Sequence, residues 1–333
     1  MPRFLILTLA LLLTGAVAGA QTAEPIRYVV TAPTGATLTL DGTLSRPANG
    51  SVPVVLLIAG SGPTDRDGNS AYGMKSDAFK MLADSLNRLG IAVARYDKRY
   101  SGTNLTVAAV LLPEKNFRFD DFVRDAVGFI QQLRADKRFS GVVVAGHSEG
   151  SLVGMLAARQ TNAAGFVSIA GAGRNIADVL KVQTQTLPDT LRRIAHADLD
   201  SLRAGQPVNA PPRALLSLLR PSVQPLMISW MRYDPAVEIK RYAGPVLLIN
   251  GRRDFQVPVG EAERLKAARP DAQLVLFDRM THVLKDAASD SMADKQKTYN
   301  DPSLPLTPGL AAVIAQFVRR STGSSGAAGR SVR

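Results

Sequence analysis

A serine enclosed by two glycines at the end of an apolar run is the strongest chemical signal in the sequence. Residues 142–151 read VVVAGHSEGS, in which Gly146 and Gly150 flank Ser148. A buried strand that turns directly into a helix needs glycines where its backbone is most crowded, and the turn leaves the serine at its apex. The Gly-x-Ser-x-Gly pattern alone also fits a tight turn with an inert serine. Its place between an apolar strand and an apolar helix favours a nucleophile.

A serine hydroxyl becomes a useful nucleophile only beside a base, and the sequence offers three histidines. His147 adjoins Ser148 but is expected to point away from it along the turn. His196, in RRIAHADLD, is expected on a helix of the proline-containing segment 174–241, as a solvated surface residue. His282, in DRMTHVLK, follows the last expected strand and therefore lies at the carboxyl edge of the sheet. We predict that His282 is the base.

The base needs a carboxylate to orient it, and this acid is expected after the next-to-last strand. The segment LLINGRRDFQVP places Asp254 there, and Pro258 prevents the strand from resuming. The alternative role for Asp254 is that of an aspartate that caps a turn. Asp278 is a weaker candidate because it is close to His282 on the same strand exit, and Asp286 is weaker still. We predict Asp254 as the acid.

Two backbone amides must stabilise the oxyanion of an acyl-transfer reaction. We expect one from Glu149, which opens the helix after the serine. The other is expected from AGSGPTDRDGN, where either Ser61 or Gly62 could supply it. The DRDGN part resembles a calcium loop but lacks the distal bidentate glutamate, so a hydrogen-bonded turn is expected there. We expect no metal ion and no organic cofactor.

Apolar strand-like runs alternate with amphipathic helix-like runs along most of the chain. The expected strands are residues 27–47, as a hairpin with turns at Gly35 and at Asp41-Gly42, then 52–60, 91–97, 141–146, 165–172, 244–251 and 272–277. The expected helices are residues 77–89, 119–136, 151–160, 259–268 and 308–319. This alternation predicts an α/β fold with a mostly parallel sheet and helices on both of its faces.

Residues 174–241 break the alternation with scattered prolines and no convincing strand. Loops this long within a compact domain are usually functional lids, so we expect a helical cap over the end of the sheet. Its apolar side chains are expected to form a small core of their own or to cover an acyl pocket; they include Leu215, Leu216, Leu218, Leu219, Met227, Ile228, Trp230 and Met231.

The two ends of the chain differ from the core. Residues 1–20 carry Arg3, an apolar stretch and Ala18-Gly19-Ala20, which predicts a cleaved signal peptide. The apolar stretch, from residue 4 to residue 17, is shorter than the roughly 20 residues of a spanning helix, so no stable membrane anchor is expected. The expected core comprises residues 21–173 and 242–320, and residues 321–333 are expected to be a disordered tail. These features predict a periplasmic or secreted protein.

The composition narrows the function classes. The chain has no cysteine, which excludes a thiol nucleophile and a disulfide framework. Its net charge of +12 invites a nucleic-acid interpretation. However, the basic residues alternate with acidic ones and form no stripe with interleaved aromatics, so no nucleic-acid partner is expected. The expected partner is a small-molecule ester substrate, and the sequence leaves the oligomeric state open.

Four segments together, AGSGPTDRDGN, FKMLADSLNRLGIAVARYDKR, GHSEGS and GRRDFQVP, resemble the α/β-hydrolase superfamily. Within it the chain is similar to bacterial carboxylesterases of the EstD type and to the capped, serine aminopeptidase-like hydrolases of family S33. The resemblance runs from about residue 27 to residue 319 and implies Ser148 as nucleophile, Asp254 as acid and His282 as base. It departs at Tyr100, where relatives commonly have a glycine. This tyrosine is expected either to narrow the crevice or to pack against the cap.

These residues predict an enzyme that hydrolyses carboxylic esters of short to medium acyl chains through an acyl-enzyme. The first alternative is an amide or peptide hydrolase with the same three residues. Such an enzyme would hold the substrate amine with carboxylates of the cap, for which Glu238, Asp198 and Asp234 are candidates. The second alternative is a binding protein on the same scaffold, and the presence of all three residues argues against it.

Overall fold

One sheet of eight strands organises the computed structural model, which describes residues 21–31, 35–48 and 50–323. The strand order is β1-β2-β4-β3-β5-β6-β7-β8. The strands are β1 (Gln21–Thr31), β2 (Thr37–Pro47), β3 (Val52–Ile58), β4 (Ala92–Tyr96), β5 (Phe139–His147), β6 (Gly165–Ile169), β7 (Val246–Gly251) and β8 (Gln273–Phe277). The expected signal peptide, and the expected tail beyond residue 323, lie outside the described residues.

The sheet is mostly parallel, as expected. β1 and β2 pair antiparallel, as do β2 and β4, and the pairs from β4 through β3, β5, β6 and β7 to β8 are all parallel. β3 shows why its sequence is apolar throughout: Val54 and Leu56 belong to the core on one face, and Val55 and Leu57 to the core on the other. A strand buried on both faces cannot alternate apolar with polar residues.

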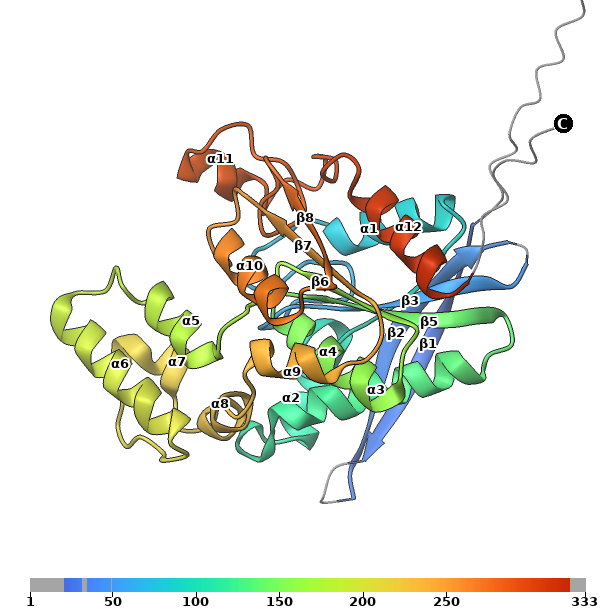
Figure 1. Cartoon of the computed structure of the whole chain (residues 1–333). Coiled ribbons are helices and arrows are strands. Elements are labelled where there is room, and N and C mark those ends of the chain that lie inside the picture. Colours follow the sequence, from blue (N-terminus) through green and yellow to red (C-terminus); the bar gives the residue numbers. More distant parts are fainter. Residues whose placement is uncertain (1–20, 32–34, 49, 324–333) are drawn as a thin grey trace, which may run out of the picture.

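Helices cover both faces of this sheet (Figure 1). The core on one face includes buried residues of α3 (Phe119–Ala135), α4 (Glu149–Thr161), α9 (Pro235–Arg241) and α10 (Val259–Ala268). The core on the other face includes residues of α1 (Ala78–Arg88) and α12 (Leu310–Ser321). Two short helices were not expected from the sequence: α2 (Leu105–Leu111) and α11 (Met292–Lys297).

The expected turn at Asp41-Gly42 is wrong. β2 continues through both residues, and Gly42 pairs with Ile26 of β1 and with Tyr96 of β4. A side chain here has no room, because a Cβ atom on Gly42 would lie 2.6 Å from the carbonyl oxygen of Arg95. The glycine therefore permits close packing within the sheet and does not reverse the chain.

The segment between β6 and β7 is helical, and in Figure 1 its first helices project from the side of the sheet. Besides α9 it contains α5 (Ile176–Gln183), α6 (Asp189–Arg203), α7 (Leu216–Leu219) and α8 (Gln224–Trp230). We call residues 174–241 the cap. The cap has its own core, whose buried residues are Ala177, Ala195, Leu199, Leu202, Leu215, Leu219, Val223, Met227 and Met231. Trp230 joins the cap to α3 by stacking on Phe119, with ring centroids 5.3 Å apart.

Among the described residues, no helix is both long and apolar enough to cross a membrane. The same residues contain no cluster of three or more histidine, aspartate or glutamate side chains suited to holding a metal ion.

Candidate active site

Ser148 occupies the sharp turn that joins β5 to α4. Its backbone has φ 55° and ψ −121°, a conformation that non-glycine residues rarely adopt. The glycines on either side are required by space. A Cβ atom on Gly146 would lie 2.0 Å from the carbonyl oxygen of Gly150, and one on Gly150 would lie 2.4 Å from the carbonyl oxygen of Ile58. The pattern seen in the sequence thus allows backbone to pack directly on backbone beneath the serine.

Asp254 and His282 are joined by a buried hydrogen bond. Nδ1 of His282 lies 2.7 Å from Oδ2 of Asp254, so the protonated Nδ1 donates to the carboxylate. The other oxygen, Oδ1, accepts the backbone amides of Gln256 and Val257, each at 2.9 Å. The carboxylate is therefore fully occupied and fixed in orientation, and it holds the imidazole with Nε2 available for chemistry.

The competing residues lie elsewhere. Asp278 is an exposed side chain paired with Arg252, and Asp286 accepts a hydrogen bond from Thr307. His196 lies on α6, where its Nε2 is 3.1 Å from the carbonyl oxygen of Lys181. None of these three side chains faces a cavity that contains Ser148.

The loop after β3 is held rigidly against the serine. The Asp97 carboxylate, at the end of β4, accepts the backbone amide of Arg66 at 2.8 Å and its guanidinium at 2.6 Å. Asp65 accepts the amides of Asp67 and Asn69 at 2.9 and 2.8 Å. The DRDGN segment is thus the hydrogen-bonded turn that the sequence predicts.

The backbone amides expected to stabilise an oxyanion belong to residues that lie close to Ser148. Glu149 is the first residue of α4, so its amide has no acceptor within the helix. Ser61 lines both cavities that contain Ser148, whereas Gly62 lines only one of them. Gly62 adopts φ 73°, which glycine tolerates without strain.

Lys98 ties together the two segments that carry these amides. Its Nζ donates to the carbonyl oxygen of Gly60 at 2.5 Å and to Oε1 of Glu149 at 2.8 Å. The ammonium also lies 4.6 Å from the ring centroid of Phe122. The lysine and glutamate side chains are almost completely buried. Lys98 was not expected from the sequence, although its place just after a strand at the carboxyl edge of the sheet was a usable signal.

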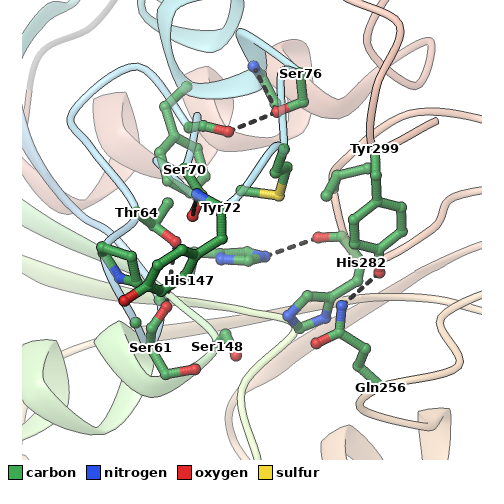
Figure 2. A pocket seen from close by; sticks show the side chains of 18 residues that line it. Ser61, Thr64, Ser70, Tyr72, Ser76, His147, Ser148, Gln256, His282 and Tyr299 are labelled. Carbon is green, nitrogen blue, oxygen red and sulfur yellow. Dashed lines mark hydrogen bonds between the residues drawn. The ribbon is translucent and has the colours of Figure 1, made fainter. Parts of the chain in front are cut away.

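His147 supports the backbone of His282. Its Nε2 lies 2.7 Å from the carbonyl oxygen of His282 (Figure 2). Because a carbonyl only accepts, Nε2 of His147 carries the proton. Burial lowers the pKa of His147 to about 3, and the neighbouring His282 lowers it in the same direction. His147 is therefore a neutral structural group, which agrees with the expectation that it does not serve as the base.

Ser148 lies at the junction of two cavities. The first, of about 320 Å³, is lined by the loop after β3 and by the segment that carries His282 and Tyr299 (Figure 2). The second, of about 210 Å³, lies between α4 and the cap, where Leu218, Met227 and Trp230 line it. Within the described part of the chain the Ser148 hydroxyl has no hydrogen-bond partner. It is free to turn toward His282, with which it shares the first cavity.

The carboxylates considered for binding a substrate amine do not line either cavity. Glu238 is buried and paired with Arg159 and Arg241. Asp234 caps the N-terminus of α9 by accepting the amide of Ala236 at 2.9 Å. Asp198 lies on α6.

Tyr100 does not narrow the crevice beside Ser148. It lines neither cavity, and its ring lies edge-on to Phe117, with centroids 5.6 Å apart. Its φ of 61° lies in the left-handed region that favours glycine. The hydroxyl of Tyr100 is buried without a hydrogen-bond partner.

Comparisons with known proteins show which family this chain belongs to. A family model described as Serine aminopeptidase, S33 matches residues 70–286. Esterase EstD of Thermotoga maritima is 31% identical over 255 residues, which cover 74% of this chain and 58% of that protein. The chain thus spans less than two thirds of the length of this relative.

Two solved structures illustrate the likeness in fold. The α/β hydrolase GrgF from a Penicillium species has a TM-score of 0.56 and 15% identity, with 91% of this chain and 99% of that chain covered. The Pyrococcus horikoshii acylaminoacyl peptidase has a TM-score of 0.54 and 15% identity, with 90% of this chain and 42% of that chain covered.

Proposed function

Because the chain belongs to the serine aminopeptidase S33 family, we propose that it is a serine hydrolase that cleaves carboxylic esters through Ser148, His282 and Asp254. Its α/β-hydrolase fold, expected from the sequence, is confirmed by the mostly parallel sheet and by the solved structures that resemble it. The observation that carries the proposal is the convergence of three separate segments. Ser148 and His282 line one cavity, and His282 donates to a buried Asp254.

In the first step the Oγ of Ser148 attacks the ester carbonyl carbon while Nε2 of His282 takes the hydroxyl proton. The carbonyl oxygen becomes an oxyanion, which accepts hydrogen bonds from the backbone amide of Glu149 and from that of Ser61 or Gly62. Ser61 is the better candidate because it lines both cavities beside Ser148. The bond to the alcohol oxygen then breaks as the proton on Nε2 passes to that oxygen.

In the second step a water molecule attacks the acyl-enzyme and gives its proton to His282. The acid leaves, and the proton returns to Ser148. Throughout both steps the Asp254 carboxylate keeps the Nδ1 proton of His282 in place and stabilises the imidazolium that forms transiently. The two amides of Gln256 and Val257 keep that carboxylate from rotating away.

Esters rather than amides are favoured by the surroundings of the serine. An aminopeptidase would need an uncommitted carboxylate to hold the substrate amine, whereas Glu149, the acidic residue that lines the second cavity, is paired with Lys98. The likeness to an esterase adds support. We propose that the acyl chain lies in the second cavity, whose modest volume and apolar side chains fit short to medium chains.

The test is labelling with a fluorophosphonate probe followed by peptide mapping. Modification of the peptide that contains Ser148, and its loss in Ser148→Ala, is the expected result. Ser70→Ala is a matched control, because Ser70 lines the same cavity and its loss should leave the labelling intact. Labelling of a different serine, or none in a folded protein that also hydrolyses no nitrophenyl butyrate, would overturn the proposal.

A further inference from the structure

The position of His282 distinguishes the two cavities beside Ser148. The imidazole lines the first cavity and not the second. Because its Nδ1 is bound to Asp254, proton transfer must go through Nε2. In ester cleavage this proton goes to the alcohol oxygen, which must therefore lie on the side of the serine where His282 lies. This arrangement directs the alcohol half of the ester into the first cavity, so that the second cavity remains for the acyl half.

The first cavity has an apolar and aromatic surface. Met74 comes from the loop after β3 and Phe79 from α1, and Val283 and Tyr299 come from the segment that follows β8. Figure 2 shows Tyr299 beside His282. Aromatic edges and a thioether make favourable contacts with a flat ring. The loop that forms one wall is held by the Asp97 and Asp65 hydrogen bonds, so this surface exists before a ligand binds.

Several polar side chains also line this cavity, and two of them already make hydrogen bonds within the loop itself. Thr64 donates to the carbonyl oxygen of Ser61 at 3.1 Å, and Ser76 donates to that of Gly68 at 2.7 Å. The Tyr299 hydroxyl accepts the Gln256 side-chain amide at 2.6 Å. Burial raises the pKa of Tyr299, so its hydroxyl keeps its proton. Among the described residues this proton has no acceptor, which leaves it for an oxygen of the ligand.

The cavity also carries no net charge. Its lining contains no aspartate, glutamate, lysine or arginine. The nearby ion pairs of Asp97 with Arg66 and of Lys98 with Glu149 belong to residues outside the lining. A charged leaving group would lose its hydration on entering and find no partner.

We propose that the first cavity is the leaving-group site and that it selects uncharged alcohols that carry an aromatic ring. This inference rests on the proposed ester hydrolysis and adds a second specificity to it. The ring lies between the loop after β3 and Tyr299. An oxygen substituent on the ring accepts a hydrogen bond from the Tyr299 hydroxyl. As the bond between the carbonyl carbon and the alcohol oxygen breaks, that oxygen takes the proton from Nε2 of His282. The alcohol therefore leaves as a neutral molecule, and the acyl group stays on Ser148.

The test uses butyrate esters that share one acyl group and differ in the alcohol. Benzyl, ethyl and 4-carboxybenzyl butyrate have alcohols of similar intrinsic leaving ability. We expect kcat/KM for benzyl butyrate to exceed that for ethyl butyrate by about tenfold or more, the effect of one well-buried apolar group. We expect the 4-carboxybenzyl ester to be poorer than the benzyl ester by a similar factor. Because the acyl-enzyme is the same for all three, its hydrolysis rate should not change.

Two lining variants make the assignment specific to this cavity. Met74→Lys places a cation there, so the ratio of 4-carboxybenzyl to benzyl kcat/KM should rise about tenfold. Tyr299→Phe should lower kcat/KM for 4-methoxybenzyl butyrate more than for benzyl butyrate. Leu218→Ala, in the second cavity, is the matched control and should leave the alcohol ratios unchanged while altering the preference among acyl chains.

The outcomes separate this inference from the proposed function. Equal kcat/KM for all alcohols, with fluorophosphonate labelling of Ser148 intact, would overturn the leaving-group site and leave the esterase proposal standing. A change of alcohol preference in Leu218→Ala, with none in Met74→Lys, would reverse the assignment of the two cavities. Absence of Ser148 labelling in the folded wild-type protein would contradict both the leaving-group site and the esterase proposal.

Discussion

Lys98 and Glu149 form a buried ion pair beside the turn that carries Ser148. Their 2.8 Å contact joins the end of β4 to the start of α4, and the same ammonium reaches the carbonyl oxygen of Gly60. Gly60 precedes Ser61, and Glu149 supplies an amide of its own. One lysine thus fixes the spacing between the two proposed oxyanion donors, without touching the substrate.

Removal of this lysine tests the relationship. Lys98→Met leaves the Glu149 carboxylate buried and unpaired, which should cost about 3–5 kcal/mol of unfolding free energy. In the fraction that remains folded, kcat should fall about tenfold or more at nearly constant KM, because oxyanion donors act in the transition state. Urea unfolding and steady-state kinetics measure the two effects.

The exposed pair between Lys181 and Asp200 provides the control. Lys181→Met should change stability by less than about 1 kcal/mol. The double variant Lys98→Met with Glu149→Gln removes both charges and should regain part of the lost stability. Equal losses in the two lysine variants, or an unchanged kcat in Lys98→Met, would contradict this role.

Substitutions at Ser148 should separate chemistry from strain. Ser148→Ala should lower kcat by roughly four orders of magnitude or more and leave the stability nearly unchanged. Ser148→Gly should be equally inactive but more stable by about 1 kcal/mol, because glycine adopts the φ of 55° without strain. If the glycine variant is the less stable of the two, the strain assigned to this turn is wrong.

The cap should set the acyl preference through the residues that line the second cavity. Trp230→Ala enlarges that cavity, so the kcat/KM ratio of octanoate to butyrate esters should rise about tenfold. Met231 is buried in the core of the cap and lines neither cavity. Met231→Ala should therefore cost about 2–5 kcal/mol of stability and keep the wild-type ratio. A shift of the ratio in Met231→Ala alone would contradict this division.

The neutral His147 should make the protein sensitive to acid. Its folded pKa of about 3 lies below the ordinary value of 6.5, so between these values the unfolded chain binds a proton that the folded protein does not. The free energy of unfolding should therefore fall as the pH drops from about 6.5 toward 4. The slope of the unfolding free energy against pH reports how many more protons the unfolded chain binds than the folded protein. Urea titrations at successive pH values should show that His147→Gln lowers this number by one. His196→Gln is the control on α6, and parallel slopes in all three proteins would contradict the prediction.

Tyr100 offers a stabilising substitution. Tyr100→Phe removes a buried hydroxyl without a partner and keeps the ring on Phe117, so the unfolding free energy should rise by about 1 kcal/mol. Tyr72, which is 84% exposed, provides the comparison, and Tyr72→Phe should change stability by less than about 0.5 kcal/mol. A loss of stability in Tyr100→Phe would mean that its hydroxyl has a partner.

The sequence was informative where local chemistry decides structure. Strands that are buried on both of their faces appear in the sequence as unbroken apolar runs. The glycines on either side of Ser148 can be recognised in the sequence because close backbone contact requires them. The error at Asp41-Gly42 has the same origin, since a glycine needed for close packing looks like one needed for a turn. Lys98, His147 and Tyr299 act through partners more than 25 positions away in the chain, such as Glu149 and His282, and a single sequence gives no measure of such contacts.

The walls of the two cavities are encoded by different stretches of the chain. Among the described residues the cavities share only Ser61, Ser148 and Gln256. The other walls of the second cavity come from residues 149–235 and Val257, and those of the first from residues 60–79, His147 and residues 282–299. Under the proposed assignment of the two cavities, a mutation in one stretch should alter the recognition of one half of the ester and spare the other. Acid and alcohol preference should then vary independently, so relatives that exchange only the cap should differ in the acids they release while accepting the same alcohols.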